Sequence, residues 1–152
     1  LKLATQIKIK PFHFISTLDV FQTSRAFGTN LITEQDELNP SEAIRFDGYT
    51  KSKWVSEKMV TTAQMRGLPV SIYRPAMITG HSKTGVANVN DLMNRLIKGF
   101  VQLGYAPSFD MMFNVAPVDY FSKGAIYISR QEESLGKTFN FINPQPVSMT
   151  QF

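Results

Sequence analysis

The sequence predicts an α/β fold in which helices cover the faces of a parallel sheet. Short β-rich runs alternate with helical segments almost throughout the 152 residues, and this order is typical of parallel sheets with helical crossovers. The first of these runs is of the kind that is buried within such a sheet. Hydrophobic residues make up 43% and charged residues 18%, as in ordinary globular proteins, so one domain with one core is expected.

The first third of the chain predicts a short helix, a strand and a loop. Residues 1–5 have helical character but no capping residue in front of them, so we expect the sequence to begin inside a helix. Residues 8–17 are β-rich and end in the hydroxyl pair Ser16-Thr17. The polar residues 18–43 are expected to form a loop, with a candidate helix start at 39–42.

The centre of the chain predicts two helices separated by a strand. Residues 48–65 carry apolar side chains at helical spacing, and Gly67 stops this helix. Residues 70–74 are β-rich and predict the second strand. A second helix is expected over 90–103 from its apolar stripe, with Gly104 as its terminator.

The last third predicts two strands and a third helix. Residues 113–118 form a short β-rich run, and Asp119 can cap the helix that follows it. Residues 137–142 predict the final strand. No internal repeat or low-complexity tract interrupts this order.

Composition and charge argue against several kinds of site. The net charge of +4 and the pI near 9.4 suit an anionic ligand such as a phosphorylated cofactor, but the basic residues are scattered and no nucleic-acid motif is present. The absence of cysteine excludes disulfides and thiolate chemistry. His13 and His81 lack a second ligand at metal spacing, so no metal site is predicted. No apolar run approaches the ~20 residues that span a bilayer, and a cytoplasmic location is expected.

Three polar side chains form the candidate site. Tyr49 and Lys53 are four residues apart on a predicted helix, which places them on one face and one turn from each other. Thr17 ends the first predicted strand, and the turn 74–77 follows the second. Because ligands of open α/β sheets bind outside the carboxyl ends of strands, Thr17 and this turn are expected to face one crevice.

These residue types suit the reduction of a carbonyl group. A carbonyl that receives hydride develops negative charge on oxygen, and the Tyr49 phenol can donate a proton to it with help from the Thr17 hydroxyl. An ammonium beside a phenol favours the phenolate and lowers a pKa that is otherwise about 10. Lys53 can also donate to ribose hydroxyls. Taken singly, Thr17 could cap a strand end, and Tyr49 and Lys53 could be a packed aromatic and a solvated cation.

Five segments carry a family resemblance, and they occur in the family's order between Leu1 and about Pro144. They are PFHFIST, GYTKSKWVSEKMV, RGLPVSIYRPAMITGHSKTG, NDLMNRLIKGFVQLGYAP and PVDY. The first two resemble the extended short-chain dehydrogenase/reductase family. The longer set resembles its thioester reductase branch, the reductase domains of polyketide synthases, nonribosomal peptide synthetases and carboxylic acid reductases.

The resemblance implies a role for each candidate residue. Thr17 corresponds to the catalytic hydroxyl residue, Tyr49 to the acid, and Lys53 to the lysine that binds the cofactor. NADPH is implied as that cofactor, with Tyr49 and Lys53 touching it. The backbone segment that lies along the nicotinamide corresponds to the turn formed by Pro75, Ala76, Met77 and Ile78.

One feature of the family is missing. Its members begin with a glycine-rich strand-to-helix turn that receives the cofactor pyrophosphate, whereas the glycines here are isolated. We therefore expect residues 1–152 to be a partial reductase domain, the C-terminal portion of a Rossmann-like doubly wound parallel sheet. Such a part is expected to hold the catalytic groups without binding the dinucleotide well by itself. Residues 78–110 are expected to form a small substrate-facing lobe.

The function implied by the resemblance is NAD(P)H-dependent release of a carrier-bound acyl thioester as an aldehyde or alcohol. Its partner would be an acyl or peptidyl carrier protein whose phosphopantetheine bears the thioester, within a larger multidomain chain. One alternative is a sugar-nucleotide epimerase or dehydratase, which uses the same three groups on a sugar carbon. Another is a non-catalytic dinucleotide-fold module, because one fold supports many functions.

Overall fold

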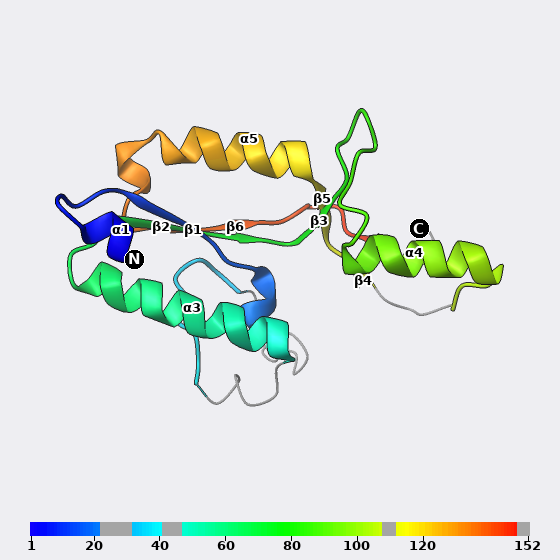
Figure 1. The fold of residues 1–152 in the computed structure, drawn as a ribbon, viewed down its shortest axis with the longest axis horizontal. Helices are drawn as coiled ribbons and strands as arrows, with labels where there is room; N and C mark the ends of the chain where they lie inside the picture. The colour runs from blue at the N-terminus through cyan, green and yellow to red at the C-terminus, as the bar shows by residue number, and fades with distance from the viewer. Residues whose placement is uncertain (22–31, 41–46, 108–111, 149–152) are drawn as a thin grey trace. The chain divides into compact units, whose positions relative to one another are not determined.

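The computed structural model (Figure 1) divides into two compact units. The described residues are 1–21, 32–40, 47–107 and 112–148. The first unit comprises Leu1–Ala76 and Gly124–Phe141, and the second comprises Met77–Lys123 and Ile142–Phe152.

The first unit is built on a parallel sheet of three strands. In the order β1-β2-β6, these are Phe12–Ile15, Val70–Pro75 and Thr138–Phe141. Helix α3 (Gly48–Met65) lies on one face of this sheet, and the part of helix α5 (Val118–Ser129) that belongs to this unit, from Gly124 onward, lies on the other (Figure 1). The predicted α/β class with a parallel sheet is therefore confirmed.

The apolar core of the first unit lies between α3 and the sheet. Val60 of α3 packs with Val70 and Ile72 of β2, and Phe12 and Phe14 of β1 pack against the same cluster. These strand residues alternate along their strands, as expected for side chains that share one face of a sheet. The short opening helix α1 (Lys2–Thr5), which was predicted from the first five residues, adds the buried Ala4.

Local interactions determine both ends of α3, whose bounds agree with the prediction. The Asp47 carboxylate accepts a hydrogen bond of 2.8 Å from the Thr50 backbone N–H, which satisfies one of the free donors in the first turn. Gly67 follows the helix with a φ of +94°, a conformation that residues with a Cβ rarely adopt. A capping residue and a glycine therefore bracket the helix in the sequence.

The predicted loop over 18–43 is only partly correct. Leu18–Phe21 form a 3₁₀ helix, η1, in which Val20 and Phe21 are buried with Leu38, and Trp54 of α3 packs against this cluster. Burial of two apolar side chains directly after the strand explains the ordered turn. Residues 22–31 and 41–46 lie outside the described residues, and so does half of the expected helix start at 39–42.

Helix α5 comes very close to β6 at a glycine. A Cβ on Gly124 would lie 2.7 Å from a ring carbon of Phe141, well inside van der Waals contact. No other residue type fits here without movement of the helix or the ring. On this face of the sheet, Phe141 and Phe139 also pack on the ring of Tyr73.

The second unit contains two small sheets and one exposed helix. The parallel pair is β3 (Met77–Thr79) with β5 (Val115–Pro117), and the antiparallel pair is β4 (Met112–Phe113) with β7 (Val147–Ser148). Helix α4 (Leu92–Leu103) begins at the capping residue Asp91 and ends at Gly104, whose φ is +66°. The predicted helix over 90–103 and its terminator are confirmed.

Three predictions about the second unit are wrong. Met77 and Ile78 were expected in a turn but continue in extended conformation as β3. The expected single strand over 113–118 is split at Asn114, whose side chain exchanges hydrogen bonds of 2.7 and 2.8 Å with the Asn143 backbone. Asp119 lies inside the first turn of α5 and binds the backbone and hydroxyl of Ser82, at 2.9 Å each, so it is not the expected cap.

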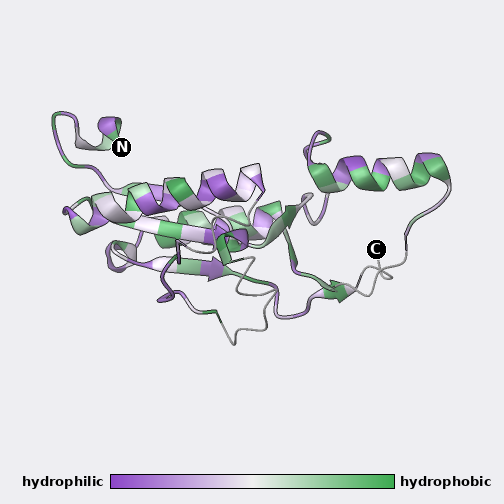
Figure 2. Ribbon diagram, turned by 90° about the horizontal axis from the view of Figure 1, so that it is seen from below, coloured by the Kyte–Doolittle hydropathy of each residue, from purple (hydrophilic) through white to green (hydrophobic). Residues whose placement is uncertain are grey.

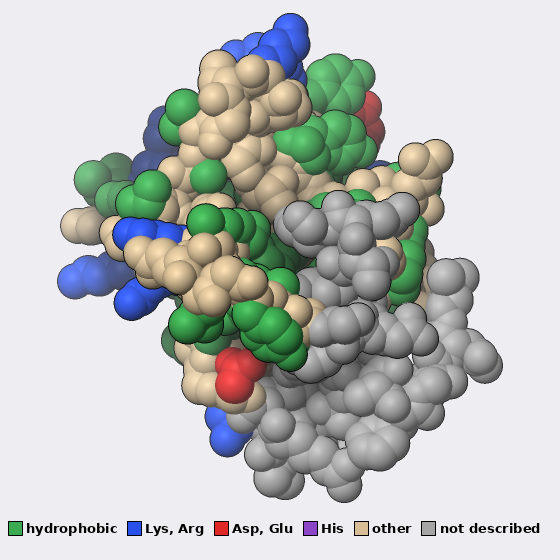
Figure 3. All heavy atoms as spheres, turned by 90° about the vertical axis from the view of Figure 1, so that its right-hand side faces the viewer, with side chains coloured by type: hydrophobic (Ala, Val, Ile, Leu, Met, Phe, Trp, Pro, Cys, Tyr) green, Lys and Arg blue, Asp and Glu red, His purple; other side chains and the backbone are tan. Residues whose placement is uncertain are grey.

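Helix α4 presents apolar side chains to solvent. Figure 2 shows hydrophobic and hydrophilic residues side by side along it, and Figure 3 shows hydrophobic side chains exposed among polar ones. None of its residues is buried, and Leu92, Val101 and Leu103 are each more than 70% exposed. In the described ranges, no helix combines the length and apolar character needed to cross a membrane.

Candidate active site

Thr17 lies just beyond the carboxyl end of β1. The Ser16 backbone N–H donates to the Tyr73 carbonyl at 2.7 Å, which extends the pairing with β2 one residue past the strand. Thr17 is next, and its side chain is buried. Its hydroxyl accepts from the Asp19 backbone N–H at 3.2 Å and donates to the Asp19 carboxylate at 3.3 Å. The hydroxyl is thus held at the strand tip, and it must leave Asp19 to donate to a substrate.

Tyr49 and Lys53 lie in the first turns of α3. The cap at Asp47 holds this end, since the buried Thr50 donates to it through both its backbone N–H and its hydroxyl. The Tyr49 side chain is 58% exposed, so the phenol is not part of the hydrophobic interior. A surface phenol near the start of the helix agrees with access to a ligand.

The Lys53 side chain connects α3 with β1. Its ammonium donates a hydrogen bond of 3.0 Å to the carbonyl oxygen of Ile15, and its nitrogen lies 5.7 Å from the centre of the Phe14 ring. Ile15 is the last residue of β1 and precedes Thr17 by two positions. The structure therefore brings Lys53 to the strand end that carries Thr17, with Tyr49 one turn closer to the helix N-terminus.

The predicted cofactor segment begins at the same edge of the sheet as Thr17. Ile15 pairs with Tyr73 in parallel register, so Thr17 and Pro75 occupy corresponding positions at the carboxyl ends of β1 and β2. The Ala76 N–H donates to the Phe141 carbonyl at 2.9 Å, which holds the chain in line with β6. Met77 and Ile78 belong to the second unit, and their predicted role stays a prediction.

A buried ion pair, which the sequence interpretation missed, lies beneath these residues. Arg74 was expected in the turn that faces the crevice, but its side chain points to α3. Its Nε and Nη2 atoms both donate to Oε1 of Glu57, at 2.9 and 2.6 Å. Both side chains are almost completely buried, at 5% and 1% exposure. Arg74 shares its sheet face with the core residues Val70 and Ile72, and an arginine in such a series signals a buried acidic partner.

A second tyrosine lies nearby on the other face of the sheet, but it does not suit acid catalysis. The Tyr73 hydroxyl lies 3.0 Å from Nδ1 of His13. Burial raises the pKa of Tyr73, although a hydrogen bond with Ser71 opposes this, and burial lowers the pKa of His13. Both shifts favour the neutral forms of the phenol and the imidazole. This makes Tyr49 the better candidate for proton donation.

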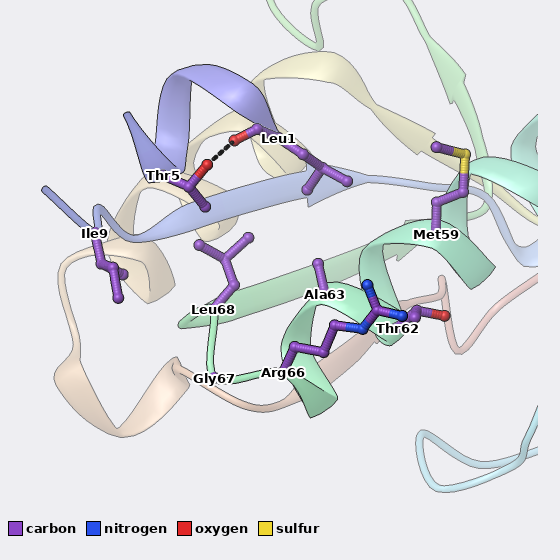
Figure 4. A pocket seen from close by; sticks show the side chains of 9 residues that line it. All are labelled: Leu1, Thr5, Ile9, Met59, Thr62, Ala63, Arg66, Gly67 and Leu68. Atoms are coloured by element: carbon purple, nitrogen blue, oxygen red, sulfur yellow. Dashed lines mark hydrogen bonds between the residues drawn. The ribbon is translucent and has the colours of Figure 1, made fainter. Parts of the chain in front are cut away.

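A surface cavity of about 430 Å³ lies at the opposite end of the first unit (Figure 4). The residues around it come from the opening helix and the residue before it, the stretch between α1 and β1, the last turns of α3 and the loop before β2: Leu1, Thr5, Ile9, Met59, Thr62, Ala63, Arg66, Gly67 and Leu68. Ile9 and Leu68 precede the amino ends of β1 and β2, whereas Thr17 follows a carboxyl end. The cavity is therefore separate from the candidate active site. In the described parts of the chain, His, Asp and Glu form no cluster that could hold a metal ion.

Comparison with known sequences decides the family. The profile of an NAD-binding family described as Male sterility protein matches residues 1–125. The chain belongs to the male sterility protein family. As a member of this family, it is 38% identical over 144 residues to a linear gramicidin synthase subunit of Brevibacillus parabrevis, and the match covers 95% of the chain. It is also 36% identical over 142 residues to the aldehyde reductase lnbA of Aspergillus flavus, with 89% of the chain covered.

A solved structure agrees with the family and the fold. This male sterility family member is similar to the terminal R domain from the myxalamid PKS-NRPS biosynthetic pathway, with a TM-score of 0.84 and 42% identity over 98% of the chain. The resemblance to extended short-chain dehydrogenase/reductases of the thioester reductase type is thereby confirmed. The chain spans 37% of that R domain, 14% of the aldehyde reductase and 3% of the gramicidin synthase subunit.

Proposed function

We propose that this chain carries the catalytic part of an NADPH-dependent reductase that releases a carrier-bound acyl or peptidyl thioester as an aldehyde or alcohol. The observation that carries the proposal is the 3.0 Å hydrogen bond from Lys53 to Ile15, which brings the Tyr49 and Lys53 helix to the strand end bearing Thr17. Similarity to a terminal R domain and to an aldehyde reductase supports it.

The residues at this edge suit the nicotinamide and ribose half of a dinucleotide. Lys53 offers a cation at the carboxyl end of β1, and Ser16 places a buried hydroxyl there that has no hydrogen-bond partner among the described residues. Lys53 would hold the ribose, and Pro75 and Ala76 would border the nicotinamide. The 152 residues contain no glycine-rich turn for the pyrophosphate, so these side chains account for one half of the ligand only.

Each of the three polar side chains then has a distinct task. The cofactor, when bound, supplies hydride to the carbonyl carbon of the thioester. Tyr49 gives its proton to the carbonyl oxygen as negative charge develops there, and the Thr17 hydroxyl donates a hydrogen bond to the same oxygen. The charge on Lys53 favours departure of the Tyr49 proton. The product is a hemithioacetal, whose carbon–sulfur bond breaks to leave an aldehyde and the protonated carrier thiol.

The thioester would arrive on the phosphopantetheine arm of an acyl or peptidyl carrier protein. The related linear gramicidin synthase subunit is far longer than its matched region, which agrees with a carrier supplied within a multidomain chain. Residues 78–110 lie in the second unit, and we propose this segment as the substrate-facing lobe. The exposed apolar side chains of α4 agree with contact to an acyl chain.

The test is aldehyde release by the full-length protein from an acyl thioester on a carrier protein, followed through NADPH oxidation. Tyr49→Phe is expected to lower this rate by about 10²- to 10⁴-fold, the contribution of a general acid, while NADPH affinity stays nearly unchanged. Tyr120→Phe is the matched control, because both tyrosines are 58% exposed. Normal turnover by Tyr49→Phe would remove Tyr49 from the reaction.

Two further measurements address the alternatives. Conversion of a UDP-sugar by the wild-type protein, without thioester reduction, would favour an epimerase or dehydratase. NADPH binding without turnover of either substrate would indicate a non-catalytic module. Parallel binding measurements with NADH test the preference for the phosphorylated cofactor.

A further inference from the structure

Glu57 extends the row formed by the two candidate residues on α3. Tyr49, Lys53 and Glu57 follow each other at intervals of four residues, which places them along one side of the helix. Lys53 binds the carboxyl end of β1 through the Ile15 carbonyl, and Glu57 binds Arg74 near the carboxyl end of β2. The helix is therefore attached to two neighbouring strands at points one turn apart.

The attachment at Glu57 is directional. Two N–H groups of the planar Arg74 guanidinium converge on a single oxygen of Glu57, at 2.9 and 2.6 Å. The guanidinium carbon also lies 4.7 Å from the centre of the Phe21 ring, in the short helix that follows Thr17. Arg74 thus contacts both the helix that carries Tyr49 and the turn that follows Thr17.

The ion pair between Glu57 and Arg74 is poorly suited to stabilising the fold. Oε2 of Glu57 and Nη1 of Arg74 are buried and have no hydrogen-bond partner in the described part of the chain. Buried ion pairs lose much of their Coulomb attraction to desolvation, and apolar side chains of similar volume often stabilise a fold as well or better. The incomplete hydrogen bonding increases this cost. The directional hydrogen bonds of this pair fix the orientation of α3 on the sheet, which an apolar pair would not do.

We propose that Glu57 and Arg74 are positioning residues that align Tyr49 and Lys53 of α3 with Thr17 at the strand edge. The inference rests on the proposed function, because the alignment matters for proton donation to the carbonyl oxygen. Without the pair, α3 keeps its apolar contacts but can rotate or slide on the sheet. Displacement of a catalytic group by about 1 Å can lower a rate by about 100-fold.

The decisive variant replaces both partners with apolar residues of similar size, Glu57→Leu with Arg74→Met, in the full-length protein. The matched control is Ser71→Ala, which removes the buried hydrogen bond of 2.9 Å from Ser71 of β2 to the Ser134 carbonyl on the other face of the sheet. Glu57→Gln retains the shape and one acceptor oxygen, and it serves if the double variant fails to fold. Measurements comprise Tm, kcat and KM for the carrier-bound thioester, and hydrogen exchange of the α3 amides.

The positioning role predicts that kcat of the double variant falls about tenfold to 100-fold at unchanged KM and with Tm close to wild type. Amides near Tyr49 and Lys53 should exchange faster, and Glu57→Gln should retain part of the rate. Ser71→Ala should lower Tm and leave kcat unchanged. A folded double variant with kcat within about twofold of wild type and unchanged exchange would overturn the proposal.

Hydrogen exchange of the α3 amides tests the positioning role of Glu57 and Arg74 independently of the proposed function. If wild-type protein reduces no thioester, the proposed function fails, and the amide exchange of α3 alone decides whether the pair aligns the helix. If wild-type protein is active and Tyr49→Phe is not, a fully active double variant overturns the positioning role only. If the double variant does not fold, a Glu57→Gln variant with wild-type kcat and wild-type exchange overturns it as well.

Discussion

The ammonium of Lys53 donates a hydrogen bond of 3.0 Å to the carbonyl oxygen of Ile15, a residue 38 positions earlier in the chain. This contact joins the face of α3 that carries Tyr49 to the last residue of β1. A carbonyl partner leaves the positive charge of the lysine uncompensated, in contrast to a carboxylate partner. Lys53 can therefore act on a phenol or a ribose hydroxyl while remaining tied to the sheet.

Loss of the Lys53 ammonium should weaken both cofactor binding and turnover. Lys53→Met keeps a long apolar side chain beside Phe14 but removes the donor to Ile15 and the positive charge. We expect kcat/KM for the thioester to fall by about 10²-fold or more, with weaker NADPH binding, measured by steady-state kinetics and by titration. The exposed Lys51 on the same helix is the matched control, and Lys51→Met should have wild-type values. Equal effects of the two substitutions would contradict a specific role for Lys53.

The Thr17 hydroxyl should contribute mainly to kcat. Thr17→Val keeps the shape of the buried side chain but cannot donate to an oxyanion, and loss of one such donor costs about 10²- to 10³-fold in kcat. Thr17→Ser should restore most of the rate because the hydroxyl is retained. Single-turnover kinetics on a carrier-bound thioester measure the effect. A fully active Thr17→Val protein would leave Thr17 with only its turn contact to Asp19.

The close approach of α5 to β6 predicts opposite effects of alanine at two helical glycines. Gly124→Ala forces a methyl group against Phe141, where a Cβ would lie at 2.7 Å, and overpacking of this kind costs about 1–3 kcal/mol of unfolding free energy. At Gly99 in α4 an added Cβ would meet no atom within 4 Å, so Gly99→Ala should gain about 0.5–1 kcal/mol. Denaturant titration measures both. Similar free energies of unfolding for the two variants would show that α5 moves freely away from the sheet.

The carboxylate of Asp119 should make stability depend on acid pH. Hydrogen bonds from the Ser82 backbone and hydroxyl hold the pKa of Asp119 below its ordinary value of 3.8. Since the folded state favours the ionised form, the stabilisation is present above pH 3.8 and is lost as pH falls through the lowered folded-state pKa. Asp119→Asn should therefore have a lower Tm at neutral pH and a smaller loss of Tm on acidification.

Thermal unfolding of this variant at several pH values provides the measurement. Asp91→Asn is the control at neutral pH, because Asn and Asp are equally good N-capping residues and the substitution retains the acceptor for the Met93 N–H. A Tm that depends on pH in the same way in wild type and in Asp119→Asn would show that the contact with Ser82 carries no stability.

Features that depend on nearby residues were predictable from the sequence. Apolar side chains at helical spacing and the glycine after its end predicted α3 over residues 48–65, and the structure confirms these bounds and adds Asp47 as the capping carboxylate. Alternation of such helices with apolar runs indicated the parallel sheet. The antiparallel pair β4 and β7 was not predictable, because strands of two residues carry no sequence pattern and form only where distant segments meet.

The sequence by itself determined the order of α3, α4 and α5 and of the sheet strands β1, β2 and β6, the family and the side chains available for chemistry, because hydrophobic periodicity and helix-ending residues act over a few residues. Only the tertiary structure decided that Lys53 reaches the end of β1 and that Arg74 turns away from the strand edge to pair with Glu57, 17 residues before it. Contacts of this kind depend on how the whole helix packs on the sheet, and no local pattern specifies which polar groups then come together.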